Sequence, residues 1–168
     1  MAQVTTSRKA TVTLPADDQI LITREFDAPR ELVFKAFTTP ELVKRWWHAK
    51  RGEMTVAEID LRVGGKWRYV MVTPDGMEVG FHGEYREVVP NERLVSTEFY
   101  EGVPEGVSEE DATTVNTATF VEVDGRTLVT ILVQAPNKIT RDAIIDSGME
   151  NGLQDALDLL EEVAISLG

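Results

Sequence analysis

The last stretch of the chain, MENGLQDALDLLEEVAISL at residues 149–167, decides the fold. Its apolar side chains recur at helical spacing on one face, while its acidic and amide side chains occupy the other. The apolar face consists of Met149, Leu153, Ala156, Leu157, Leu160, Val163, Ala164 and Leu167. A long helix with one apolar face needs an apolar surface to cover it, so the sequence predicts a C-terminal helix held by the rest of the chain.

Upstream of this helix, the pattern changes to alternating strands joined by turn residues. The turns Pro74-Asp75-Gly76 and Asp124-Gly125 favour antiparallel hairpins. Two short helices are expected after the first strand, because Pro29 and Pro40 suit a first helical turn, and the second should end near Trp46-Trp47. Residues 101–111, which include four glutamates, are expected to form a solvated loop. The strands are predicted over residues 19–26, 53–61, 66–72, 78–88, 93–100, 114–123 and 126–134. The predicted fold is therefore α+β, a curved seven-strand antiparallel sheet gripping the long C-terminal helix.

The length and charge of the chain restrict its organisation and its partners. At 168 residues it fits one domain, predicted over residues 19–168, preceded by an N-terminal arm or edge strand at 1–18. With 29 acidic against 17 basic residues, the formal net charge is −12. This charge repels phosphate backbones and anionic headgroups, so we expect neither nucleic acid nor a membrane as a partner.

Residue composition also excludes several kinds of chemistry. The chain has no cysteine and only two histidines, His48 and His82, so we expect no disulfide, no metal site and no cofactor. His48 lies beside basic residues at a predicted helix end, and His82 alternates with Phe81 and should face outward. No signal segment and no apolar run of about 20 residues is present, which predicts a cytoplasmic protein.

Short motifs along the chain resemble those of a known family. They are FDAPRELVF at residues 26–34, WW at 46–47, GGKW at 64–67, GEY at 83–85, RLVSTE at 93–98 and SGME at 147–150. With the order of elements, they resemble the START-like (SRPBCC, helix-grip, Bet v-like) superfamily. The more specific resemblance is to the family of homologues of the activator of heat-shock protein 90 ATPase. It implies a cavity between the sheet and the terminal helix that holds an apolar molecule.

Large side chains alternate on the predicted strands and would line such a cavity. Trp67, Tyr69 and Met71 share one strand face, and Phe81 shares a face of the next strand with Tyr85. These side chains fill a core equally well. Gly152 within the long helix favours a cavity, because glycine costs about 1 kcal/mol there unless a ligand or a strand lies close. The predicted ligand-binding residues are Trp47, Trp67, Tyr69, Met71, Phe81, Glu98, Met149 and Leu153.

Glu98 is the charged residue best placed for a role in binding or catalysis. It shares a strand face with Leu94, Ser96 and Tyr100, and the family resemblance places Leu94 inside. If this face points inward, desolvation raises the pKa of Glu98, which becomes a hydrogen-bond anchor or a general base. If it points outward, Glu98 is an ordinary surface residue.

The function expected from these features is non-covalent binding of a small hydrophobic ligand, lipid-like or polyketide-like, with no catalytic residue required. One alternative is a cyclase or hydratase that uses Glu98 with Tyr69 or Tyr85. Another is a stress-related or chaperone-related protein-interaction module. A homodimer is left open. No nucleophilic triad, phosphate-binding loop or metal-ligand spacing is present in the sequence to require an enzyme.

Overall fold

The structure is a computed structural model that describes residues 9–168. Its elements follow the order β1 (Thr11–Thr13), β2 (Gln19–Phe26), α1 (Arg30–Thr38), α2 (Pro40–Val43), β3 (Glu53–Ile59), β4 (Lys66–Val72), β5 (Glu78–Val89), β6 (Arg93–Tyr100), α3 (Glu109–Ala112), β7 (Thr114–Val123), β8 (Arg126–Gln134), α4 (Lys138–Asp146) and α5 (Met149–Ser166). This order confirms the predicted α+β arrangement, with strands followed by a long terminal helix.

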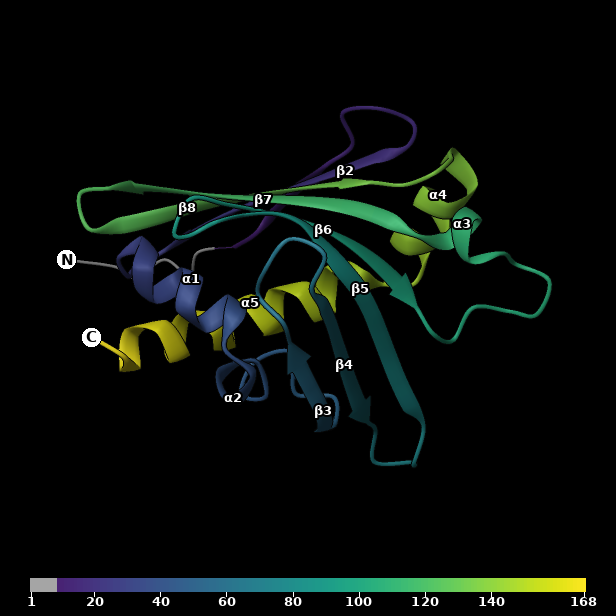
Figure 1. Cartoon of the computed structure of the whole chain (residues 1–168), viewed down its shortest axis with the longest axis horizontal. Helices are drawn as coiled ribbons and strands as arrows, with labels where there is room; N and C mark the ends of the chain where they lie inside the picture. The colour runs from purple at the N-terminus through teal and green to yellow at the C-terminus, as the bar shows by residue number, and fades with distance from the viewer. Residues whose placement is uncertain (1–8) are drawn as a thin grey trace.

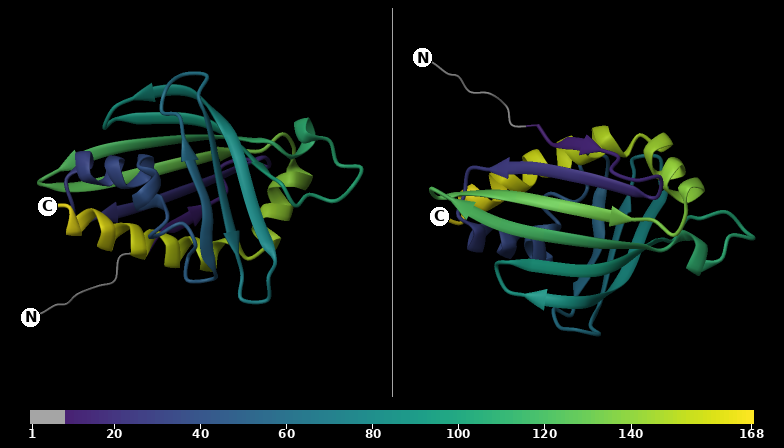
Figure 2. Two further views of the ribbon diagram at one scale, coloured as in Figure 1. Left: turned by 60° about the horizontal axis from the view of Figure 1, so that its bottom comes forward. Right: turned by 90° about the horizontal axis from the view of Figure 1, so that it is seen from above.

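The strands form one antiparallel sheet that curves around α5. Across the described residues the spatial order is β1-β2-β8-β7-β6-β5-β4-β3. Figure 1 shows α5 beneath the sheet, with α1 and α2 on the same side, and Figure 2 shows β3, β4 and β5 crossing over α5. Register shifts in β3 and β5 mark bulges, which bend strands and increase their twist. The curved sheet therefore presents a concave inner face to α5.

The sheet has eight strands in the described part of the chain, one more than predicted. The additional strand, β1, pairs with β2 and corresponds to the edge strand considered for residues 1–18. The side chain of Gln154 on α5 holds the backbone of Ala10, accepting from its N–H at 3.0 Å and donating to its C=O at 2.9 Å. Residues 1–8 of the predicted arm lie outside the described residues.

Two helices differ from the sequence prediction. The helix expected to reach Trp46 and Trp47 ends at Val43, and turns follow it. Ala49 and Lys50 then adopt positive φ angles of 53° and 64°, a conformation that a right-handed helix excludes. The acidic loop after β6 contains α3, whose N-terminus is capped by the Ser108 side chain.

Helix α5 is packed tightly only along its C-terminal half. Its buried residues there are Ala156, Leu157, Leu160, Val163 and Ala164. An aromatic cluster fills the nearby end of the fold: Phe120 of β7 lies 5.3 Å from Phe34 and 5.4 Å from Phe37, both on α1. Met149 and Leu153, in the N-terminal half of α5, remain partly exposed. The free space beside α5 is therefore expected near its N-terminus.

A buried arginine joins α5 to the sheet. Arg24 of β2 is only 3% exposed. Its guanidinium contacts Asp158 at 2.9 Å and Glu161 at 3.3 Å, and lies 4.9 Å from the centre of the Phe26 ring. Because burying an unpaired charge is costly, these two carboxylates fix the position of α5 against β2.

Candidate functional site

An aromatic cluster covers the inner face of β4 and β5. Trp47, from the turn after α2, lies 5.5 Å from the ring of Tyr69 and 5.5 Å from that of Phe81. The ring centre of Trp67 lies 4.8 Å from that of Tyr69, with the two ring planes tilted by 45°. Trp46 points elsewhere and donates its indole N–H to the Ala36 carbonyl. The two adjacent tryptophans thus serve different surfaces, and Trp47 belongs to the inner wall.

The position of Trp67 depends on a glycine in the neighbouring strand. Trp67 pairs with Gly83, and its indole crosses that residue to donate a hydrogen bond to the Thr97 carbonyl at 3.2 Å. A Cβ atom at Gly83 would overlap the Thr97 carbonyl oxygen and lie 2.7 Å from the indole nitrogen. The absence of a side chain at Gly83 therefore lets a tryptophan lie flat along the wall.

Glu98 of β6 faces the same side of the sheet as this cluster. Its neighbour two residues on, Tyr100, pairs with Phe81, and their rings lie 5.0 Å apart. The Asn116 side-chain amide donates to Glu98 Oε1 at 2.8 Å, and the Thr114 hydroxyl donates to Asn116 Oδ1 at 3.0 Å. Desolvation raises the pKa of Glu98, and the bond from Asn116 opposes part of that rise.

Two buried tyrosines complete the polar part of this wall. The side chains of Tyr69 and Tyr85 lie close enough for each to influence the pKa of the other. Burial raises the pKa of Tyr85 to about 12, and burial, followed by the nearby Tyr85 and Glu98, raises that of Tyr69 well above its usual value. Both phenols are therefore neutral at physiological pH and can donate or accept a hydrogen bond.

The inner face of the central strands remains accessible although it faces α5. Ile131 of β8 is partly exposed, whereas Val129 and Val133 on the same face are buried. Its partner on β7, Ala118, is also partly exposed and has a small side chain. Glu98 lies deep enough for desolvation to raise its pKa, yet it too keeps accessible surface. Residues that are deep and still accessible are typical of a cavity wall.

The remaining predicted site residues lie toward the ends of this wall. Met149 and Leu153 pack on the core from the N-terminal half of α5. Met71 is buried near the end of β4, where its Cγ lies 2.8 Å from the position of a Cβ at Gly52. A Cβ at Gly152 would meet only Arg51 Cζ, at 3.9 Å, so no strand backbone presses on this glycine.

Asn116 and Ala118 are candidate site residues that the sequence analysis missed. Neither a lone asparagine nor a lone alanine in a strand signals a cavity. Their role depends on the register that places Asn116 opposite Ser96 and Ala118 opposite Leu94. Asn116, Ala118 and Phe120 are each two residues apart, so they share one face of β7. Phe120 is buried, which would identify that face as the inner one once the register was known.

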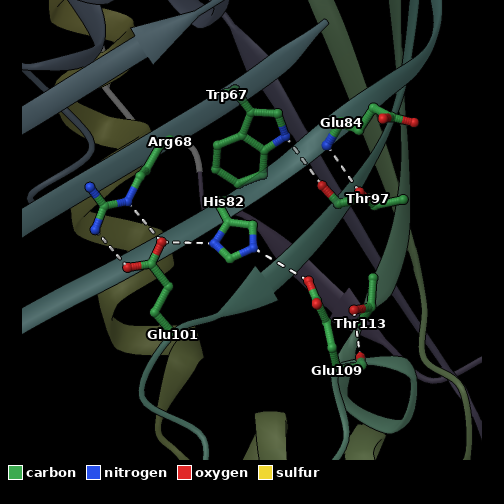
Figure 3. Close-up of polar contacts among 8 residues, drawn as sticks. All are labelled: Trp67, Arg68, His82, Glu84, Thr97, Glu101, Glu109 and Thr113. Carbon is green, nitrogen blue, oxygen red and sulfur yellow. Dashed lines mark hydrogen bonds and ion pairs between the residues drawn. The ribbon is translucent and has the colours of Figure 1, made fainter. Parts of the chain in front are cut away.

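The outer face of the sheet carries a separate polar network, drawn in Figure 3. Glu101 accepts two hydrogen bonds from Arg68, each at 2.9 Å, and a third contact at 2.8 Å from His82 Nδ1. The other ring nitrogen of His82 lies 3.4 Å from Glu109 of α3. His82 thus faces outward, as the strand alternation predicted, and this network fastens the loop after β6 to the sheet.

A hollow of about 560 Å³ accompanies this network on the outer face. It is lined by side chains of both charges, among them Lys66, Arg86, Glu84 and Glu110, together with Phe99. It is open to solvent and lacks the aromatic enclosure of the inner face. We therefore assign the candidate binding site to the inner face.

Removing the Glu101 charge is expected to lower the free energy of unfolding by an amount that depends on pH. Its hydrogen bonds from Arg68 and then from His82 hold the pKa of Glu101 at about 2, below its usual 4.5. A depressed pKa stabilises the fold above pH 4.5, and this contribution disappears as the pH falls toward 2. Denaturant unfolding should show Glu101→Gln less stable than the parent at pH 7, with the difference narrowing below pH 4.5. A difference independent of pH would contradict this assignment.

Neither a metal centre nor a membrane span is visible in the described residues. Within residues 9–168, no group of three or more histidine, aspartate or glutamate side chains is arranged to hold a metal ion. None of the helices in that range combines the length and the apolarity that crossing a bilayer requires.

Solved structures from several bacteria share this architecture. A protein from Rhodobacter sphaeroides is 25% identical, with a TM-score of 0.85 over 95% of this chain and 100% of its own. Proteins from Nitrosomonas europaea and Mycobacterium smegmatis are both 24% identical, with TM-scores of 0.79 and 0.80. The alignments cover 91% and 92% of this chain, and 97% and 96% of theirs. No functionally curated protein matches the chain.

The curved sheet closed around a long terminal helix defines a START-like, helix-grip protein. The profile of one family within this class, described as Activator of Hsp90 ATPase homolog 1-like protein, matches residues 27–164. The chain belongs to this family, which confirms the resemblance seen in its motifs.

Proposed function

We propose that this protein binds a small hydrophobic molecule non-covalently between the inner face of the sheet and the N-terminal half of α5. The observation that carries the proposal is the accessible surface kept by Ile131, Ala118 and Glu98 on the inner face of central strands. In a sheet packed fully against its helix, such positions would be buried as Val129 and Val133 are.

The composition of the wall suits an apolar, partly aromatic molecule. Trp47, Trp67, Tyr69 and Phe81 present ring faces and edges, which contribute a large apolar contact area. Glu98, with the hydroxyls of the tyrosine pair, supplies a few polar groups within this apolar surface. A mainly apolar wall with a few convergent polar groups is the usual composition of a small-molecule site. In the proposed site, Met149 and Leu153 contribute from α5 and Met71 lies at the far end of β4.

Filling the cavity should weaken binding without unfolding the protein. Nile red is a suitable probe because it is apolar, uncharged and fluorescent in apolar surroundings. Ala118→Met adds volume at the inner face of β7, and we expect it to weaken Nile red binding at least about tenfold, since several methylene contacts are worth more than 1.4 kcal/mol. The adjacent Thr119→Met adds a similar side chain on the outer face and should leave binding unchanged.

Thermal unfolding of the two variants provides an independent control. If space is available next to Ala118, its replacement by methionine costs little stability, whereas in a filled core overpacking costs about 1–3 kcal/mol. Equal Nile red affinity for both variants, or a large destabilisation confined to Ala118→Met, would contradict the proposed cavity.

Catalysis by a cyclase-like or hydratase-like mechanism is a second candidate for the same site. The raised pKa of Glu98 and the neutral Tyr69–Tyr85 pair favour it, because these groups could exchange protons with a bound molecule. Such an activity needs the same cavity and adds a chemical step. A bound molecule that is recovered unchanged after long incubation therefore supports binding alone.

A further inference from the structure

Within the part of the chain that the structure describes, one carboxyl oxygen of Glu98 has no protein partner. Asn116 donates to Oε1, and no hydrogen bond or ion pair to Oε2 is found in residues 9–168. The only fully buried side-chain polar atoms without a partner in that range are Arg24 Nε and Arg126 Nε. Glu98 Oε2 therefore has no partner but keeps accessible surface, and it is available to a molecule in the cavity.

Asn116 is held in the orientation that makes it a donor to Glu98. Its own side-chain oxygen accepts the Thr114 hydroxyl, and Thr114 is 4% exposed. The NH2 group of the same amide donates one hydrogen bond to Glu98 Oε1. This chain of hydrogen bonds fixes the Glu98 carboxyl group and makes it an acceptor on the inner wall.

No cation compensates Glu98 within the described part of the chain. Within residues 9–168, the arginines paired with α5 are Arg24, which contacts Asp158 and Glu161, and Arg51, which contacts Asp155. The other polar groups near Glu98 are neutral phenols and an amide. A ligand carboxylate beside Glu98 would therefore face a like charge in a desolvated place, which is strongly unfavourable.

A ligand with an O–H or N–H group meets the opposite situation. It can donate to Glu98 Oε2 and form a charge-assisted hydrogen bond, which is stronger than one between neutral partners. The ligand's donor also replaces part of the hydration that the Glu98 carboxylate lost on burial. The wall thus discriminates between apolar molecules by the chemistry of their polar end.

Building on the proposed function, we infer that the physiological ligand is an uncharged apolar molecule with a hydroxyl or N–H donor, which Glu98 anchors. Carboxylates of the same size and shape, including fatty-acid-like anions, are rejected. Glu98 and its hydrogen-bonded partner Asn116 determine this preference. The aromatic wall contributes affinity for an apolar ligand whether or not the ligand carries a hydrogen-bond donor.

A series of naphthalenes that differ in one substituent tests this inference at neutral pH. Naphthol carries a donor, methoxynaphthalene has none, and naphthoate is an anion, all substituted at the same ring position. Displacement of Nile red measures their affinities. We expect naphthol to bind at least about tenfold more tightly than methoxynaphthalene, because a hydrogen bond to a charged group is worth roughly a factor of ten or more. Naphthoate should bind at least about tenfold more weakly than methoxynaphthalene.

Two isosteric variants attribute this ranking to Glu98. Glu98→Gln should improve naphthoate binding and reduce the advantage of naphthol. Glu84→Gln removes the same charge from an exposed position of β5 and should leave the ranking unchanged. An equal gain in naphthoate affinity for both variants would mean that the overall negative charge, not Glu98, is responsible, and would overturn the inference.

The ranking in the unsubstituted protein is decisive even if a variant fails to fold. If Nile red and methoxynaphthalene bind but naphthoate binds as well as naphthol, the inference is wrong and the proposed cavity stands. If none of the four molecules binds, the proposed function fails and the inference fails with it.

Discussion

Replacing both Asp158 and Glu161 by alanine is expected to lower the free energy of unfolding by about 3–5 kcal/mol. Both carboxylates lie on α5 and pair with Arg24, whose side chain is almost completely buried. Without them, the guanidinium group would remain in the interior with no opposite charge. Denaturant unfolding at neutral pH measures the loss directly.

Two further variants test whether the loss comes from the buried charge. Glu150→Ala with Glu162→Ala removes the same number of charges from exposed positions of α5 and should change stability by no more than about 0.5 kcal/mol per residue. Adding Arg24→Met to the first pair of substitutions removes the unpaired cation and should restore much of the stability. If this third substitution destabilises the protein further, Arg24 contributes through packing, and our electrostatic account is wrong.

The sequence was sufficient to predict the architecture wherever a local pattern encodes it. The helical spacing from Met149 to Leu167 predicts α5, and Asp124-Gly125 predicts a tight hairpin. Both residues of that turn have positive φ, and Val123 pairs with Arg126 across it. Strand β1 was predicted only as one of two alternatives. It pairs with β2, and Gln154 holds the adjacent Ala10 from 144 residues away in the chain, a contact that no local pattern reveals.

The same distinction applies to the candidate site. Strand alternation predicted that Trp67 shares a strand face with Tyr69, and the register that pairs Tyr69 with Phe81 brings Phe81 to the same face. Alternation left the direction of Glu98 open, because that of β6 alone does not say which face meets α5. Pairing of Phe81 with Tyr100 resolves the direction. The partnership of Glu98 with Asn116 was not predictable, since it requires the register between β6 and β7.

The inner wall also depends on a residue without a side chain. We expect Gly83→Ala to lower the free energy of unfolding by about 3 kcal/mol, combining overpacking with the loss of a buried hydrogen bond. A Cβ at this position overlaps the backbone oxygen of Thr97 and crowds the indole of Trp67, and neither the strand nor a ring held between strands can move easily. Thermal and denaturant unfolding, together with Nile red binding, measure the consequence.

Gly80→Ala on the same strand is the matched control. Its Cβ would lie 2.5 Å from Glu101 Oε1, a side-chain atom on the outer face, so the strain falls on partly exposed contacts of Glu101 with Arg68 and His82 and not on strand backbone. We therefore expect a much smaller loss of stability there and no change in Nile red affinity. For Gly83→Ala, the displaced indole should also lower Nile red affinity in molecules that remain folded. If the two substitutions lower the free energy of unfolding equally and give the same Nile red affinity, Trp67 does not lie across β5 as described. The aromatic wall of the proposed site would then be wrong.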